Sequence, residues 1–255
     1  MSTRPVALVT GARRGIGRAI ALQLARSGHD LALTDFTTDM ASSEIVAACE
    51  AQGASVAFIE HDSASVAAHP ALIEQICRDL GRLDVVINSA GIGAPVRGDV
   101  LDLQPENFDR VMDINLRGAV FLCLAAAKRM VAEKSAQARS FVLITSVSAT
   151  MVSHERTDYC ISKAGLSMFA KALALRLAPE NIAVFELRPG IIQTGMTAGV
   201  AEKYDAAIAS GLVPMQRWGT PEDVALTVAS LVSGAFHFAT GTIIQADGGL
   251  SLPRL

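Results

Sequence analysis

Residues 6–17 have the sequence Val-Ala-Leu-Val-Thr-Gly-Ala-Arg-Arg-Gly-Ile-Gly, a short apolar run followed by a glycine-rich turn. A helical pattern comes next, and a second apolar run, 31–34, ends at Asp35. A strand, a glycine-rich turn, a helix and a strand ending in a carboxylate are typical of a dinucleotide site. The glycines let the backbone approach a pyrophosphate, whose charge lies at the positive N-terminus of the helix. Asp35 can accept two hydrogen bonds from a ribose diol and would repel a 2′-phosphate.

Short apolar runs alternate with longer helical patterns along most of the 255-residue chain. Strands are expected at 6–9, 31–34, 55–60, 85–88, 141–145, 183–187 and 242–245. Helices are expected near 15–27, 41–52, 66–80, 105–133, 159–178 and 221–233. Such alternation predicts a parallel sheet with helices on both faces, and continuous apolar strands are expected when both faces are buried. Because no linker or repeat interrupts the pattern, we expect one α/β domain over 1–255, a Rossmann-type doubly wound parallel sheet of about seven strands.

One segment, 194–218, breaks this alternation between the sixth strand and the last helix. Ligands bind beyond the C-terminal ends of the strands in open α/β sheets, so a long insertion there is a candidate substrate lid. Its Met196, Met215 and Trp218 could form an apolar pocket wall. Packing of the lid against the domain explains these three residues equally well.

The composition excludes several classes of protein. With 51% hydrophobic and 18% charged residues, the chain can bury a large core. A net charge of −3 with mixed signs lacks the basic stripe of a nucleic-acid-binding protein. No apolar stretch approaches the length of a transmembrane helix, and the early first strand leaves no room for a signal peptide, so we expect a cytoplasmic protein. The cysteines show no metal-ligand spacing, so we expect no metal and four free thiols: Cys49, Cys77, Cys123 and Cys160.

Tyr159 and Lys163 lie four residues apart in a predicted helix, which places them on one face with a rise of about 6 Å. A free tyrosine has a pKa of about 10, and a nearby lysine cation favours the phenolate and lowers that pKa. Ser146 follows the apolar run 141–145, at the sheet edge where we expect the active site. A hydroxyl there can bind a substrate oxygen and steady the charge that develops during hydride transfer, with Ser148 as the nearby alternative.

These residues resemble those of the classical short-chain dehydrogenase/reductase family, and the resemblance covers nearly the whole chain. The matching motifs lie in family order at residues 10–17, 88–91, 113–116, 146–163, 189–194 and 247–249. Ser89 replaces the second asparagine of the family's Asn-Asn-Ala-Gly element, which helps to tie neighbouring strands. The overall pattern is closest to the 3-oxoacyl-(acyl-carrier-protein) reductase-like branch.

The resemblance implies an NAD(P)-dependent oxidoreductase that interconverts a carbonyl and a secondary alcohol by hydride transfer. It implies that Tyr159 is the general acid for carbonyl reduction and the base for alcohol oxidation. Lys163 would lower the pKa of this tyrosine and bind the nicotinamide ribose. Ser146 would orient the substrate oxygen, and Asn115 would hold a water in a proton relay.

The same resemblance implies which residues contact the dinucleotide. Asp62 and Ser63 are expected beside the adenine, and Ile192 and Thr194 beside the nicotinamide carboxamide. The full set of expected cofactor contacts is Gly11, Arg13, Arg14, Gly15, Ile16, Gly17, Asp35, Phe36, Asp62, Ser63, Asn88, Ala90, Gly91, Tyr159, Lys163, Pro189, Gly190, Ile192 and Thr194.

Two residues point to different dinucleotides. Arg14 resembles the basic residue that pairs with a 2′-phosphate in NADP-using members, although a solvated surface charge explains it as well. Asp35 resembles the acidic residue of NAD-using members, and Phe36 follows where many NADP-using members have arginine. A carboxylate beside a phosphate dianion costs several kcal/mol in a partly buried site, of which one flexible arginine recovers only part. We therefore predict NAD as the preferred cofactor, with NADP as the alternative.

The substrate is less well defined by the sequence. A 3-oxoacyl thioester is the main prediction, and a sugar, polyol or small ketone is the alternative; a non-catalytic dinucleotide-binding regulator is a remote third. A carrier-protein reductase should present a basic patch near its pocket, but the candidate rim segments 133–139 and 179–181 are mixed in sign. His154, Met196 and Trp218 are the candidate substrate contacts. The charges of 154–156 are either solvated or bind a hydroxylated or carboxylated substrate.

The expected helix that includes 161–178 is apolar nearly all round, as is the stretch 118–130. Such helices need burial on more than one side. The resemblance implies that the two helices pair across a two-fold axis and that the last strand forms a second interface. We therefore expect a homotetramer that acts on a small-molecule carbonyl or alcohol.

Overall fold

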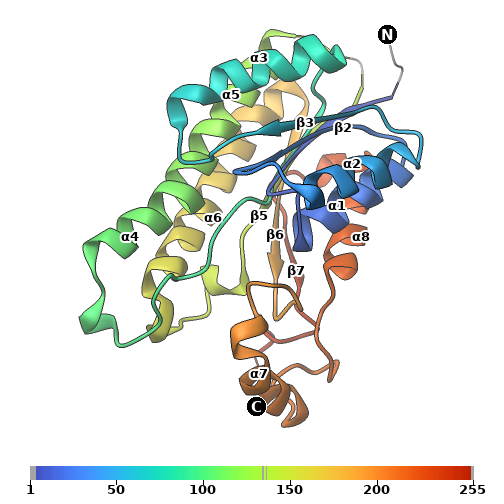
Figure 1. Ribbon diagram of the computed structural model, residues 1–255. Helices are drawn as coiled ribbons and strands as arrows, with labels where there is room; N and C mark the ends of the chain where they lie inside the picture. The colour runs from blue at the N-terminus through green and yellow to red at the C-terminus, as the bar shows by residue number, and fades with distance from the viewer. Residues whose placement is uncertain (1–3, 134, 136, 254–255) are drawn as a thin grey trace.

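A parallel seven-stranded sheet forms the centre of the molecule, with the order β3-β2-β1-β4-β5-β6-β7 (Figure 1). The computed structural model describes residues 4–253 except 134 and 136, so the rim segment 133–139 is described only in part. The strands are β1 (Val6–Thr10), β2 (Asp30–Asp35), β3 (Val56–Glu60), β4 (Val85–Asn88), β5 (Arg139–Ile144), β6 (Ile182–Pro189) and β7 (Ile243–Ala246). All seven predicted strands are confirmed, with ends shifted by at most one or two residues.

Helices cover both faces of the sheet, which confirms the doubly wound α/β fold (Figure 1). They are α1 (Gly15–Arg26), α2 (Met40–Glu50), α3 (His69–Leu80), α4 (Pro105–Met112), α5 (Ala119–Ala132), α6 (Thr157–Leu177), α7 (Ala201–Ala209) and α8 (Pro221–Val232). One layer contains α1, α2 and α8, and the other contains α3, α5 and α6. No helix in the described part of the chain is both long and apolar enough to span a membrane.

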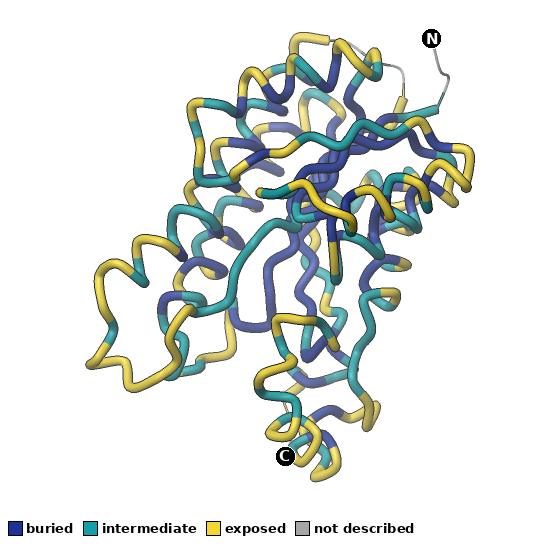
Figure 2. The backbone as a smooth tube through the Cα atoms, viewed as in Figure 1, coloured by how far each residue is buried: buried dark blue, intermediate teal, exposed yellow. Residues whose placement is uncertain are grey.

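Burial on both faces explains why the strands are continuous apolar runs. In β1, Ala7 and Val9 pack against the layer of α1 and α8, whereas Leu8 packs against the layer of α3 and α5. Successive side chains of a strand point to opposite faces, so every position of this central strand needs an apolar residue. Figure 2 shows the result, with the strands buried and the exposed positions on the outer helices and loops.

The chain is helical from Pro105 to Ala132, as predicted over 105–133, but the middle of this stretch is a π-helix. A π-helical segment, η3 (Asp113–Gly118), separates α4 from α5. Within it, Asn115 bonds to the backbone of Ile92, and a Cβ on Gly118 would lie 2.0 Å from the Ser63 carbonyl oxygen. The close approach of two distant loops, rather than local propensity, therefore accompanies the widened turn, a feature often found at functional sites.

The segment 194–218 contains a helix that the sequence pattern did not predict. A 3-10 turn, η7 (Ala198–Val200), leads into α7, which lies beyond the ends of β6 and β7 in Figure 1. Ile208 of α7 packs in a small apolar cluster with Val147, Ile191 and Val213. This cluster anchors the segment near the C-terminal edge of the sheet.

Candidate active site

The turn between β1 and α1 brings backbone N–H groups to the switch point of the sheet, between β1 and β4, where open α/β folds bind ligands. Gly11 and Gly15 have φ values of 65° and 55°, which side chains other than glycine rarely adopt. A Cβ on Gly17 would lie 2.1 Å from the Gly11 carbonyl oxygen. The first turn of α1 has neither a capping side chain nor an acidic residue, so its donors suit the pyrophosphate of a dinucleotide.

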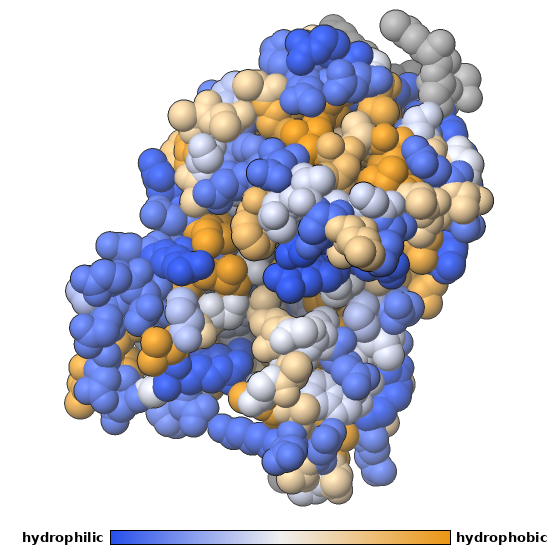
Figure 3. Space-filling view, in the orientation of Figure 1, coloured by the Kyte–Doolittle hydropathy of each residue, from blue (hydrophilic) through white to orange (hydrophobic). Residues whose placement is uncertain are grey.

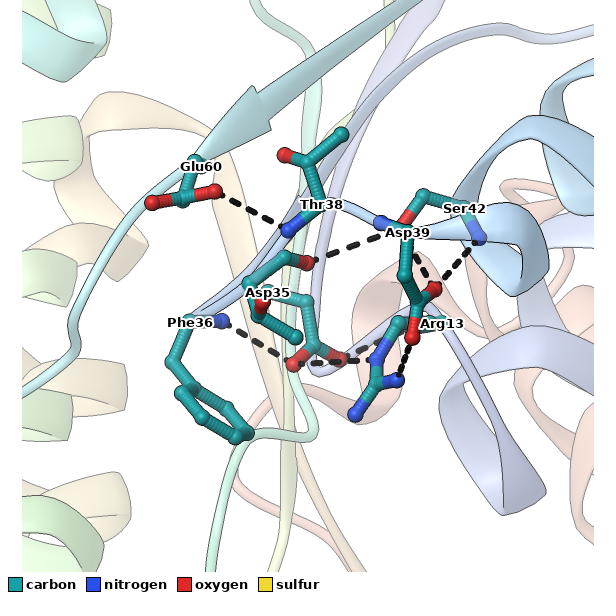
Figure 4. A network of polar contacts seen from close by, with 8 residues as sticks. Arg13, Asp35, Phe36, Thr38, Asp39, Ser42 and Glu60 are labelled. Carbon is teal, nitrogen blue, oxygen red and sulfur yellow. Dashed lines mark hydrogen bonds and ion pairs between the residues drawn. The ribbon is translucent and has the colours of Figure 1, made fainter.

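Asp35 ends β2 within a network of charged residues (Figure 4). Its Oδ1 accepts a hydrogen bond from the Phe36 N–H at 2.9 Å, and its Oδ2 accepts one from the Arg13 N–H at 3.3 Å. The Arg13 Nε lies 3.7 Å from Asp35, and its Nη1 donates to the Asp39 carboxylate. Arg13 is buried between the two carboxylates, whereas Arg14 is exposed and its side chain has no hydrogen bond or ion pair within the described residues.

The turn after β4 is tied to β1 by a threonine. The Thr10 hydroxyl accepts hydrogen bonds from the N–H groups of Ser89 and Ala90 at 3.0 and 2.9 Å. This contact joins the strands without the asparagine that Ser89 replaces. The Nδ2 of Asn88 is buried without a hydrogen-bond partner in the described chain, and a ribose or a bound water would satisfy it.

The remaining predicted cofactor residues also lie beyond the C-terminal ends of strands. Asp62 and Ser63 follow β3, and Asp62 accepts a hydrogen bond from the Ala64 N–H at 2.9 Å. After β6, Ile192 pairs with Gly219 in an isolated bridge. A Cβ on Gly15 would lie 3.6 Å from the Thr194 side chain, so the glycine turn and the loop after β6 face each other. Between them these residues line one edge of the sheet, as the dinucleotide site requires.

The three predicted catalytic side chains meet at this edge. Ser146 follows β5, and its Oγ accepts a hydrogen bond from the Ser148 N–H at 3.1 Å. Tyr159 lies in the first turn of α6, and the Ser146 hydroxyl is near enough to lower the pKa of its phenol. Lys163 is buried one turn later, with its Nζ 5.7 Å from the Tyr159 ring centroid. That Nζ donates to the Ile144 carbonyl at 3.1 Å.

The electrostatics of this group differ from the expectation for Tyr159. Burial raises the pKa of Tyr159 above its ordinary value, while the Ser146 hydrogen bond and the Arg156 charge oppose that rise. Burial also lowers the pKa of Lys163 to about 8. The expected lowering of the tyrosine pKa is therefore outweighed by desolvation. A protonated phenol is the form that can give a proton to a substrate oxygen.

The buried Asn115 side chain forms hydrogen bonds through both its amide oxygen and its amide nitrogen. Its Oδ1 accepts from the Ile92 N–H at 2.8 Å, and its Nδ2 lies 2.9 Å from the Ile92 carbonyl and 3.3 Å from the Ser162 hydroxyl. These contacts fasten η3 to the loop after β4 and to α6. The proton relay through a water at this residue stays a prediction.

The candidate substrate residues fall into two groups. Met196 lies against Gly93, and Trp218 donates to the Asp205 carboxylate at 2.7 Å beside a cavity of about 240 Å³. The surface is hollowed between the parts of the molecule that contain α4 and α7 (Figure 3). His154 is exposed, and its ring makes no hydrogen bond within the described residues. The sequence did not point to Asp205 or Asp39, because neither belongs to a recognisable motif.

The sequence and the fold of the chain are similar to those of known proteins. A family model described as Enoyl-(Acyl carrier protein) reductase, which is part of the short-chain dehydrogenase/reductase family, matches residues 11–251. The chain belongs to the short-chain dehydrogenase/reductase family and is an NAD(P)-dependent oxidoreductase acting on CH–OH and carbonyl groups.

Individual relatives share this architecture over their full length. The chain is 35% identical over 250 residues to a 3-oxoacyl-[acyl-carrier-protein] reductase of Synechocystis, covering 97% of each chain. It is 53% identical to a solved 3-oxoacyl-[acyl-carrier protein] reductase of Brucella melitensis in complex with NAD, with a TM-score of 0.97 and full coverage of both chains. A structure with bound NADP, a protein of Agrobacterium tumefaciens provisionally named 2-deoxy-d-gluconate 3-dehydrogenase, has a TM-score of 0.86 at 29% identity and 96% coverage of both.

Proposed function

We propose that the protein reduces 3-oxoacyl compounds to 3-hydroxyacyl compounds, with thioesters among its substrates. The observation that carries this proposal is the meeting of Ser146, Tyr159 and Lys163 at the edge where the dinucleotide turn lies. The names of the curated relatives favour a 3-oxoacyl substrate over a sugar or polyol. When bound, the nicotinamide dinucleotide supplies the hydride chemistry.

The side chains of the site divide the remaining work. Ser146 donates a hydrogen bond to the substrate carbonyl oxygen and holds it against the Tyr159 hydroxyl. Tyr159 gives its proton to that oxygen as negative charge develops there, and it takes the proton back when an alcohol is oxidised. Lys163, cationic below a pKa of about 8, stabilises the phenolate that remains and offers donors to a ribose. The segment 194–218 acts as a lid that excludes water.

We also infer that NAD is the preferred dinucleotide. Asp35 stands at the end of β2, where a 2′-phosphate would meet its charge, and Asp39 adds a second carboxylate nearby. Arg13 is paired with both carboxylates, which leaves the exposed Arg14 to meet a phosphate. The balance of charge at this end of the site therefore disfavours NADP.

The protein is further proposed to act in the cytoplasm as a homotetramer. Its four cysteines are free, as is usual in a reducing compartment. Burial raises the pKa of the Cys49 thiol to about 11 and that of Cys123 to about 12. Thiols held protonated in this way are poor nucleophiles, which supports the packing role expected for them.

Replacement of Tyr159 by phenylalanine tests the reaction. Tyr159→Phe removes the proton donor but keeps the ring, so we expect at least a thousandfold loss of kcat with 3-oxoacyl substrates, on the order of a missing acid–base group. NADH binding, followed by fluorescence titration, should change by less than about threefold. Turnover that survives in this variant would contradict the proposed role of Tyr159.

A further inference from the structure

An arginine stands beside the catalytic group without a role in the steps above. The Arg156 Nη2 donates to the Ser148 hydroxyl at 3.2 Å, and its Cζ lies 5.3 Å from the Tyr159 ring centroid. Ser148 in turn donates its backbone N–H to the Ser146 Oγ at 3.1 Å. The guanidinium is therefore a neighbour of both groups that handle the substrate oxygen.

The charge of Arg156 is not balanced by a carboxylate within the described residues. In the described residues no carboxylate forms an ion pair with it, although it is partly buried. The adjacent Glu155 is paired with Lys203 of α7 at 3.1 Å, and Asp158 accepts from the Tyr159 N–H at 2.7 Å. The Arg156 guanidinium donates one hydrogen bond to a serine, so its other N–H groups can donate to a bound ligand.

Position and charge together indicate what that acceptor is. A group held by Ser146 and Tyr159 through one oxygen would present its next polar atoms toward the guanidinium. Arginine donors match the two oxygens of a carboxylate, and such charged pairs are about twice as strong as neutral hydrogen bonds. Lys203 of α7 is already paired with Glu155 and does not supply this donor.

We propose that Arg156 binds the acyl end of the substrate, donating to the C1 oxygens of a 3-oxoacyl group whose C3 oxygen is held by Ser146 and Tyr159. As a cation without a carboxylate partner among the described residues, it selects a free 3-oxo acid or 3-hydroxy acid over the neutral ester or thioester. This assignment rests on the proposed 3-oxoacyl substrate, and it names the acid as the better member of that class.

A binding titration tests the subsite without turnover. Butanoate and its neutral isostere butanamide are titrated into the NADH-loaded enzyme, with NADH fluorescence as the signal. We expect the carboxylate to bind at least about tenfold more tightly than the amide in the parent protein and equally in Arg156→Gln. Arg156→Lys should keep part of the preference, because it keeps the charge but loses the fork of donors.

A matched control distinguishes direct contact of Arg156 with the ligand from a change in the net charge of the protein. Arg97→Gln removes the same charge from an exposed position that makes no hydrogen bond or ion pair within the described residues, and it should leave the preference unchanged. An unchanged melting temperature and NADH affinity of Arg156→Gln show that the loop is intact. Equal binding of the two ligands by the parent protein, or a preference that survives Arg156→Gln, overturns the proposal.

A turnover experiment separates this inference from the proposed function. With 3-oxobutanoate, Arg156→Gln should raise KM at least about tenfold, and the loss of kcat/KM should be at least about tenfold larger for this acid than for ethyl 3-oxobutanoate. Equal losses for acid and ester would mean that Arg156 only positions Ser148, and would overturn the subsite. If the parent enzyme reduces neither compound but still prefers butanoate, the 3-oxoacyl function fails and the carboxylate site stands.

Discussion

Arg13 and Arg14 are adjacent in sequence, but only Arg13 is held by the rest of the chain. The Asp39 carboxylate accepts a hydrogen bond from the Arg13 Nη1. It also caps α2, because it accepts a hydrogen bond from the Ser42 N–H at 3.2 Å. One carboxylate therefore both starts a helix and holds the arginine that lies nearest to Asp35. The choice of dinucleotide depends on this arrangement more than on the presence of a basic residue in the turn.

Removing the Asp39 charge that holds Arg13 should let the protein bind NADPH more tightly. Asp39→Asn keeps a good helix cap but removes the charge that holds the guanidinium. We expect NADPH to bind about tenfold more tightly in this variant, because the freed arginine can meet the 2′-phosphate, while NADH binding changes by less than about threefold. Fluorescence titration with both dinucleotides measures this. Glu44→Gln, which removes an exposed charge from the same helix, is the control, and an equal gain there would point to net charge alone.

The buried ammonium group of Lys163 should lower the free energy of unfolding of the protein. Burial lowers its pKa to about 8, so between this value and about 10.4 the unfolded chain binds more protons than the folded one. The free energy of unfolding of the parent protein should therefore rise with pH over that window. Lys163→Met removes the buried cation and should be more stable by about 2 kcal/mol at pH 7, although inactive.

The advantage of Lys163→Met should shrink as the pH rises from 8 to 10, because the parent lysine becomes neutral. Denaturant unfolding at fixed protomer concentration measures this difference. Lys171→Met, an exposed change on the same helix, should have little effect at either pH. A variant at Lys163 that is less stable than the parent at pH 7 would show that the hydrogen bond to Ile144 outweighs the burial of charge.

At the scale of elements, a buried ion pair in β6 hydrogen-bonds to the end of β5 and to α6, directly behind Ser146. The Glu186 carboxylate accepts from the Arg188 Nε at 2.6 Å, from Thr145 at 2.7 Å and from Ser167 at 2.8 Å. Thr145 immediately precedes Ser146, and Ser167 lies on the helix that carries Tyr159. The network thereby sets the distance between the two catalytic elements.

Removal of one partner should destabilise this junction strongly. Glu186→Met leaves the buried Arg188 guanidinium without its carboxylate and should cost about 3 to 5 kcal/mol of unfolding free energy. The double variant Glu186→Met/Arg188→Met should recover most of that loss, because no unpaired charge remains. Denaturant titrations of the three proteins measure the coupling. A double variant as unstable as the single one would mean that the hydroxyl contacts, not the ion pair, hold the junction.

At the scale of the whole molecule, one face of α6 is apolar but not covered by the chain. Ile161, Met168 and Leu175 recur at a spacing of seven residues and are 43%, 64% and 80% exposed. On α5, Phe121 is also exposed. If α5 and α6 pair with their copies across a two-fold axis, these side chains lie in the interface. Pairing would then bury apolar surface that a monomer leaves exposed to water.

The tetramer is therefore expected to depend on this face. Light scattering coupled to size exclusion should give the mass of four chains for the parent protein and a smaller species for Met168→Glu, because a charge buried in the helix pair is unpaired. Leu101→Glu changes an even more exposed leucine outside these helices and should leave the tetramer intact. A parent protein that elutes as a stable monomer would refute the assembly.

Local sequence by itself determined the seven strands, the glycine turn and the spacing of Ser146, Tyr159 and Lys163. Each of these depends on neighbours within one strand, turn or helix, and periodicity and glycine positions record such neighbours directly. The sequence pattern did not show the π-helical turn of η3 or the helix α7, because the first depends on contacts with Ile92 and Ser63 and the second on a small apolar cluster.

Only the tertiary structure decided the electrostatics. That Arg13 is held by Asp39 while Arg14 is solvated depends on the packing of two loops. That the pKa of Tyr159 is raised depends on how deeply α6 buries the phenol. Partners and burial arise from residues far apart in the chain, and they set the free energy of each charge, which a motif does not contain. The motif thus points to the candidate catalytic groups, and the fold decides how each charge behaves.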